Sequence, residues 1–287
     1  MRDRLRATLT FPRFAALTTT MTLTLVSLGV YTAATGSGLA CSAQWPLCDG
    51  GVLPQTVPSF IEWFHRLVAM VTGFLIVGTA GWAWRAADRR TAATATVAAV
   101  LLPLQVSIGA VTVTLGGMVP GGYSPPVQGA HLLVALAIFT ALTVTTLRAF
   151  ADQHVDSPVE RAGRALATAL VVLVAAALFS RLLPVVTYAP ASQAAFFGVT
   201  LALFATLVGA VRWLGLAGRP LDRGLAGLAA ACVVVAMVLG RDLVAYTPTL
   251  RLVNAAAFVV AFLAVALAAW RVREAASRTH AAGAVGD

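Results

Sequence analysis

The sequence FIEWFHRLVAMVTGFLIVGTAGW at residues 60–82 decides the fold, because it is one long apolar run with three ionisable side chains near its beginning. A helix needs about 20 apolar residues to cross a hydrocarbon core of roughly 30 Å. The chain is 59% hydrophobic and only 11% charged, with a mean hydropathy of +0.87. Similar runs occur at residues 14–34, 92–114, 127–148, 165–186, 193–214, 224–244 and 251–271. We therefore expect an all-α integral membrane protein with eight transmembrane helices in the cell membrane.

The net charge of +9 predicts an orientation rather than a nucleic-acid partner. The chain has no lysine, and its arginines lie almost wholly in alternate connections between the apolar runs. Only Arg66, Arg181, Arg241 and Arg251 lie near the opposite ends of the spans. By the positive-inside rule the arginine-rich side is cytoplasmic, so we expect both termini there. The first run is too long for a typical signal-peptide core and is expected to stay as a helix.

The polar connection AFADQHVDSPVERAGR at 149–164 separates two sets of four spans. We expect a four-helix bundle at residues 1–150, a cytoplasmic linker at 151–164, and a second four-helix bundle with a short tail at 165–287. The openings of the fourth spans, GAHLLVALA at 129–137 and LVNAAAFVV at 252–260, suggest a degraded internal repeat. Gly29-x-x-Thr32 and Gly109-x-x-Thr112 would allow close approach of either a neighbouring helix or a flat ligand.

His65 and His131 lie about four residues inside the second and fourth spans, which run in the same direction. At 1.5 Å rise per residue both imidazoles would lie roughly 6 Å below the outer edge. Two level imidazoles can bind opposite faces of one haem iron, whereas a zinc site would need a third ligand. The alternative is that each histidine hydrogen-bonds to a neighbouring helix. His154 and His280 are expected to be ordinary surface residues.

Glu62 and Arg66 flank His65 on the same helix face. An ionisable group inside a span is costly and usually has a partner or a function. Glu62 would either exchange protons beside a haem edge or form a structural ion pair with Arg66, and the sequence favours neither. Arg66 could equally hold a haem propionate.

Cys41 and Cys48 lie in the long outer connection, at residues 35–60, where a disulfide can persist. We expect them to pair and to stiffen a lid over the bundle mouth, helped by Trp45 and Pro46, although a redox role is an alternative. Cys232, in the seventh span, is expected to be a small core residue.

The first half resembles the haem A synthase family, the CtaA-type membrane proteins of cytochrome oxidase biogenesis. The resemblance rests on TGSGLACSAQWPLCDG at 35–50, IEWFHR at 61–66, LQVSIGAVTVTLGG at 104–117 and GAHLLVALA at 129–137. It implies that the methyl group at position 8 of haem O is oxidised, through hydroxylated intermediates and with oxygen from water, to the formyl group of haem A. On the matching positions His65 and His131 would hold the haem, Glu62 would be the catalytic carboxylate, and Cys41 and Cys48 would form a disulfide.

The second half departs from the family pattern. Eight-span members of the family commonly carry a second histidine pair for haem b, but SQAAFFGVT at 192–200 and RLVNAAAF at 251–258 place Phe196 or Phe197 and Asn254 at those positions. Either one haem suffices, an unusual ligand is used, or the electron path differs. This departure leaves two alternatives to haem A synthase, namely a non-catalytic haem-binding oxidase-assembly protein and a b-type electron-transfer cytochrome.

The expected partners follow from this interpretation. They are membrane lipid, haem O delivered by a haem O synthase, and an electron acceptor whose identity the sequence does not specify. A homo-oligomer is compatible with the sequence.

Overall fold

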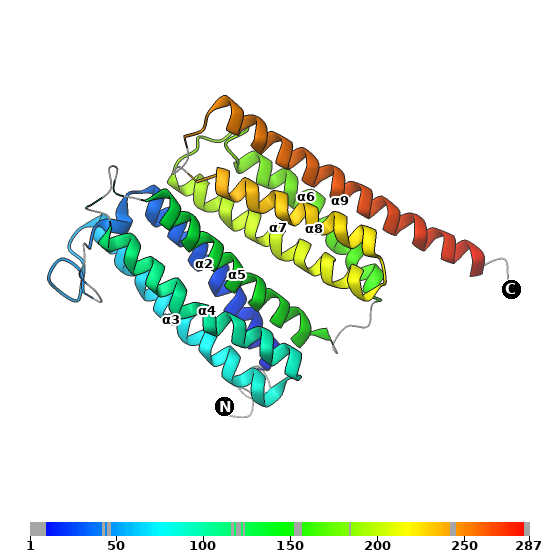
Figure 1. The fold of residues 1–287 in the computed structure, drawn as a ribbon, viewed down its shortest axis with the longest axis horizontal. Coiled ribbons are helices and arrows are strands. Elements are labelled where there is room, and N and C mark those ends of the chain that lie inside the picture. The colour runs from blue at the N-terminus through cyan, green and yellow to red at the C-terminus, as the bar shows by residue number, and fades with distance from the viewer. Residues whose placement is uncertain are drawn as a thin grey trace. The chain divides into compact units, whose positions relative to one another are not determined.

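The computed structural model describes residues 10–41, 44, 47–115, 118, 122, 124–151, 157–183, 185–241 and 245–283. Within these residues there are eight long helices and one 3-10 helix (Figure 1). They are α2 (Phe11–Ala34), η1 (Ser37–Leu39), α3 (Val57–Ala86), α4 (Arg89–Thr114), α5 (Pro125–Ala149), α6 (Pro158–Phe179), α7 (Pro190–Leu216), α8 (Pro220–Leu239) and α9 (Pro248–Gly283). All eight long helices are apolar enough to span a membrane. The expected all-α, eight-span fold is confirmed, and the protein is a multi-pass membrane protein.

The chain divides into two compact units. The first contains α2 to α5 together with the first turns of α7 (Ala189–Gly198), and the second contains α6, the rest of α7, α8 and α9. The cytoplasmic placement of the termini and the bounds of the predicted bundles stay predictions.

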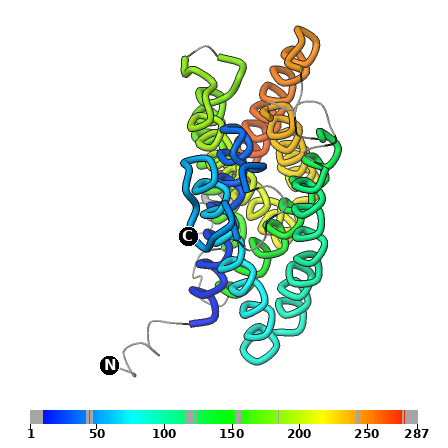
Figure 2. The backbone as a smooth tube through the Cα atoms, turned by 90° about the vertical axis from the view of Figure 1, so that its left-hand side faces the viewer, coloured from blue at the N-terminus to red at the C-terminus, as the bar shows by residue number. Residues whose placement is uncertain are grey.

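In the first unit the extensive helix contacts form a closed ring, from α2 to α3, α4, α5 and back to α2. The four helices run side by side (Figure 1, Figure 2). In such a ring α3 and α5 lie at diagonally opposite corners. Residues that α3 and α5 direct inward would therefore approach each other across the middle of the bundle, which is a usual position for a cofactor.

Each seam of this ring carries at least one hydrogen bond between side chains. Thr18 of α2 bonds Thr79 of α3 at 2.8 Å, and Thr19 of α2 bonds Thr146 of α5 at 2.8 Å. The other two seams are closed by Trp84 to Thr96 at 2.9 Å and by Thr145 to Thr94 at 3.1 Å. Small hydroxyl side chains allow close backbone approach and replace missing water partners in lipid, so these bonds fix the register of the ring.

The second unit is tied together by charged groups. Helix α9 packs on α6 and α8. Buried Asp222 of α8 accepts hydrogen bonds from Arg219 and from Arg271 of α9, both at 2.6 Å. Elsewhere in this unit the guanidinium of Arg181 lies 4.4 Å from the ring centroid of Tyr246. A buried carboxylate is tolerated because both of its oxygens are paired.

The fifth span is displaced from expectation at both ends. The expected run was 165–186, but α6 begins at Pro158 and ends at Phe179. Ser157 and Glu160 form a capping box, and Pro158 occupies the first turn, so local hydrogen bonding starts the helix earlier than hydropathy indicates. Part of the range expected as a linker is therefore helical.

Candidate functional site

The outer connection of the first unit folds into a braced loop. The expected disulfide between Cys41 and Cys48 is confirmed, with the two Cα atoms 4.7 Å apart. Asp49 and Gly50 both have positive φ, 53° and 75°, and Cys48 and Gly51 exchange backbone hydrogen bonds of 3.1 and 3.0 Å. This is the geometry of a tight Asp-Gly hairpin turn. Trp45 and Pro46 lie outside the described residues.

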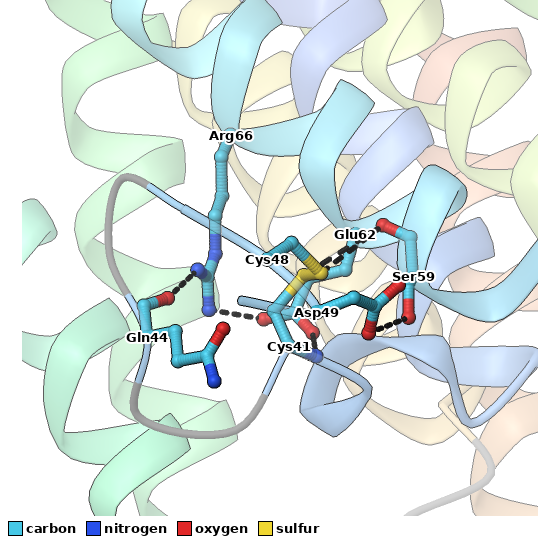
Figure 3. Close-up of polar contacts among 7 residues, drawn as sticks. All are labelled: Cys41, Gln44, Cys48, Asp49, Ser59, Glu62 and Arg66. Carbon is cyan, nitrogen blue, oxygen red and sulfur yellow. Dashed lines mark hydrogen bonds and ion pairs between the residues drawn. A yellow bond between two sulfur atoms is a disulfide. The ribbon is translucent and has the colours of Figure 1, made fainter. Parts of the chain in front are cut away.

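The loop is joined to the beginning of α3 (Figure 3). Ser59 donates from its hydroxyl to Asp49 at 3.0 Å, and both disulfide sulfurs lie against the Ser59 carbonyl oxygen, at 3.7 and 3.9 Å. The second oxygen of Asp49 accepts from the Gln55 backbone N–H at 2.7 Å. The hairpin turn, the disulfide and the first turn of α3 therefore form one rigid piece.

Glu62 lies beneath this piece and is only 2% exposed. One carboxylate oxygen accepts from the Cys41 backbone N–H at 2.7 Å, and the other is paired with the Arg66 guanidinium. Arg66 also donates to the Gln44 backbone oxygen. The ion pair with Arg66, one of the two alternatives that the sequence left open, is therefore present, and the Cys41 contact ties Glu62 to the disulfide loop as well.

His65 lies one turn further into α3. Its ring is packed against α2, because a Cβ placed on Gly29 would lie 3.0 Å from His65 Cε1. His65 Nδ1 is buried and has no hydrogen-bond partner among the described residues.

His131 of α5 has an equivalent setting against α4. A Cβ on Gly109 would lie 3.3 Å from His131 Cε1. The side-chain amide of Gln105 lies 3.2 Å from His131 Nε2. The contact fits either tautomer of His131, because the Gln105 amide can present its nitrogen as a donor or its oxygen as an acceptor.

These residues fit a haem held by two histidines. Two partly buried imidazoles come from diagonal helices, one has a buried, unpartnered ring nitrogen, and each lies against a glycine that leaves room for it. Buried polar atoms without partners are uncommon and call for an explanation such as a ligand. In the first unit the residues present are thus suited to bis-histidine haem ligation.

The positions noted in the second half do not fit a haem. Phe196 and Phe197 are 0% exposed, with ring centroids 5.7 Å apart. Asn254 is 1% exposed, and its amide donates to the Tyr246 hydroxyl at 2.8 Å. A phenyl ring is not an iron ligand, and a carboxamide is not among the usual haem ligands.

The structure adds residues that the sequence interpretation missed. Gln105 is a lone amide inside an apolar span and lies one turn before Gly109, which is a signal that could have identified it. Arg66 contacts the backbone oxygen of Gln44, and Glu62 contacts the backbone N–H of Cys41. Every residue has these backbone atoms, so the residue types in the sequence do not indicate such contacts. His154 lies outside the described residues, and the helix is described at His280 but its side chain is not.

Comparisons with known proteins show which family the chain is similar to. The family model COX15-CtaA, described as cytochrome oxidase assembly protein, matches residues 55–285. A haem A synthase of Bacillus licheniformis is 34% identical over 137 residues, which are 47% of this chain and 43% of that protein. A haem A synthase of Geobacillus kaustophilus is 36% identical over 141 residues, 48% of this chain and 43% of that protein.

A relative with another name also matches. The protohaem IX farnesyltransferase of Halobacterium salinarum strain NRC-1 is 37% identical over 136 residues, which are 47% of this chain and 29% of that protein. The chain thus spans less than half the length of each of these three relatives. The family model, in contrast, covers well over half of the chain. The chain therefore belongs to the COX15-CtaA family of cytochrome oxidase assembly proteins.

Proposed function

We propose that the protein is a haem A synthase, an oxidoreductase that converts the position-8 methyl group of haem O into the formyl group of haem A. The observation that carries this proposal is a buried carboxylate, Glu62, fixed one turn from His65, which fits haem ligation together with His131. The relatives named haem A synthase support it.

The overall change is R–CH3 + H2O → R–CHO + 4 H⁺ + 4 e⁻, so the site must release protons and an acceptor must take electrons. When bound, the haem supplies the redox-active iron and the methyl group. His65 and His131 would ligate the iron from diagonal helices. Glu62 would take up protons at its carboxylate, and Arg66 would keep that carboxylate in place.

The source of the substrate is also part of the proposal. We propose that a protohaem IX farnesyltransferase supplies haem O to this protein. The support is that a protein of that name contains a segment similar to nearly half of this chain. Co-purification of a tagged copy of the chain with such a transferase, from detergent-solubilised membranes, tests the association, and failure to co-purify after cross-linking would contradict it.

The enzymatic proposal is tested by expressing the protein with a haem O source and analysing extracted haems by chromatography and mass spectrometry. Haem A or its hydroxylated precursor is expected with the wild-type chain and not with a His65→Ala, His131→Ala variant. A preparation that demonstrably binds haem O and yields no oxidised haem would overturn the proposal and favour the two alternatives without this activity, a haem-binding assembly protein and a b-type cytochrome.

A further inference from the structure

Helices α2 and α4 carry the same short pattern at the point where each meets a histidine. Residues 27–32 read SLGVYT and residues 107–112 read SIGAVT, so both follow Ser-x-Gly-x-x-Thr. The threonine hydroxyl of each donates to the carbonyl four residues earlier, Thr32 to Leu28 at 2.9 Å and Thr112 to Ile108 at 3.0 Å. The two segments are thus alike in both sequence and local structure.

The glycine of each pattern lies against the edge of one imidazole. A Cβ on Gly29 would be 3.0 Å from His65 Cε1 and 3.7 Å from each ring nitrogen. A Cβ on Gly109 would be 3.3 Å from His131 Cε1 and 4.0 Å from Nδ1. Real Cβ contacts are rarely this short, so a side chain at either position would require the ring to move. Cε1 is bonded to both ring nitrogens, so any such movement also displaces the nitrogen that would bind iron.

We infer that Gly29 and Gly109 are positioning residues that set the rotation of the two axial imidazoles, one glycine for each histidine. The inference rests on the proposed function only in that both histidines bind one haem iron. The absent side chains allow each ring to lie against a helix backbone, and the backbone then limits rotation about the Cβ–Cγ bond. The angle between two axial imidazole planes determines the electron paramagnetic resonance g values of a low-spin ferric haem, so these glycines control a measurable property.

The two sides are not equivalent. Gln105, which precedes Gly109 by one turn, contacts His131 Nε2, whereas the corresponding position before Gly29 is Leu25. This amide contact is at the nitrogen that iron would need, so it belongs to the ring without haem, whereas the Gly109 contact at Cε1 is compatible with ligation. The contact between His65 and its glycine is the shorter of the two, so we expect a change at Gly29 to displace its ring further.

The experiment uses the full chain in detergent, loaded with ferric protohaem as the probe, and compares Gly29→Ala and Gly109→Ala with two control variants. Gly81→Ala in α3 and Gly129→Ala in α5 add the same methyl group where nothing lies within 4 Å. All four changes raise helix propensity equally. The readouts are the g values of the bound fraction, which do not depend on occupancy, and the haem bound per chain.

Gly29→Ala is expected to shift the largest g value and to lower haem content several-fold relative to the controls, with a smaller shift for Gly109→Ala. Unchanged g values and haem content in both variants would overturn the inference, even if the protein is a haem A synthase. A wild-type chain without a bis-histidine low-spin signal would instead contradict the proposed site itself. Gel filtration identifies a variant that fails to fold. If Gly29→Ala fails in this way, Gly109→Ala carries the test, because its Cβ contact is the longer one.

Discussion

At the scale of single residues, the Glu62 carboxylate is held from two directions, by the Cys41 N–H and by Arg66. Glu62→Gln keeps an oxygen for the Cys41 N–H but loses the charge that pairs with Arg66 and the capacity to take up a proton. We expect haem A formation to fall about 10²-fold or more, with the bis-histidine absorption spectrum retained. Chromatography of extracted haems and a reduced-minus-oxidised spectrum measure the two effects.

The matched control for Glu62 is Glu274→Gln, a carboxylate of α9 in the second unit. It should leave both product and spectrum unchanged. If Glu62→Gln also abolished the spectrum, Glu62 would be a structural residue of the haem pocket and not a proton acceptor.

The second prediction at this scale concerns the disulfide between Cys41 and Cys48. Replacing Cys41 and Cys48 by serine removes the cross-link that keeps the Cys41 N–H over Glu62. Closing a loop of this length is expected to contribute about 2–3 kcal/mol to stability. We therefore expect a lower midpoint of thermal unfolding and reduced haem A formation. Cys232→Ser is the control, and wild-type product formation by the double variant would contradict a positioning role for the loop.

At the scale of helices, α4 depends on its N-cap. Asp88 accepts from the Arg90 and Thr91 backbone N–H groups at 2.8 and 3.1 Å, and from the Thr91 hydroxyl. The hydrogen bond from the Thr91 side chain, followed by the two backbone bonds and the charge of Arg148, holds the pKa of Asp88 below its usual 3.8. Asp88→Ala is expected to cost about 1 kcal/mol at neutral pH.

The pH dependence of this cap follows from the direction of the shift. A carboxylate whose pKa is lowered in the folded state contributes stability above its unfolded value and loses that contribution as pH falls through the folded value. The stability gap between wild type and Asp88→Ala should therefore narrow below about pH 4, as followed by thermal unfolding in detergent. A difference in stability between the two proteins that is constant from pH 7 to pH 3 would show that the charge on Asp88 does not contribute to the stability of the folded state.

A further prediction at this scale concerns the ring formed by α2, α3, α4 and α5. The Thr18 to Thr79 bond joins α2 to α3, and both residues are fully buried. A double-mutant cycle with Thr18→Val and Thr79→Val should give a coupling of about 0.6 kcal/mol, the average for interhelical bonds in membrane proteins. Thr24, which is exposed and bonds only its own helix, provides the control. A coupling of zero would mean that packing alone fixes this seam.

At the scale of the whole molecule, we expect one haem per chain. Phe196, Phe197 and Asn254 do not fit a second haem, and among the side chains that the structure describes α3 and α5 alone supply a histidine pair. The pyridine haemochrome assay, referred to protein concentration, should give a ratio near one for the wild type. Asn254→His should leave the ratio unchanged, whereas loss of His65 and His131 together should reduce it to background. Two haems per wild-type chain would contradict this assignment.

Much of the fold followed from hydropathy, because spanning a membrane requires long apolar helices whatever their detailed sequence. His65, Glu62 and the Cys41–Cys48 pair could likewise be selected from the sequence, because ionisable groups in spans and paired outer cysteines are conspicuous. Helix ends that are set by local capping, such as the beginning of α6 after Ser157, could not be predicted from hydropathy. The Cys41 N–H on Glu62 and the Gly29 contact with His65 depend on how separate segments pack, and no local pattern encodes that.

The diagonal placement of His65 and His131 has a consequence for turnover. If both imidazoles ligate iron, most of the binding free energy comes from a part of the porphyrin that the reaction leaves untouched. Haem O and haem A would then bind with almost equal affinity, and such uniform binding does not favour dissociation of the product. The departure of haem A would depend on the affinity of whatever protein receives it. Addition of an empty acceptor apoprotein should therefore raise the steady-state rate, while excess haem A should inhibit by competing for the same two histidines.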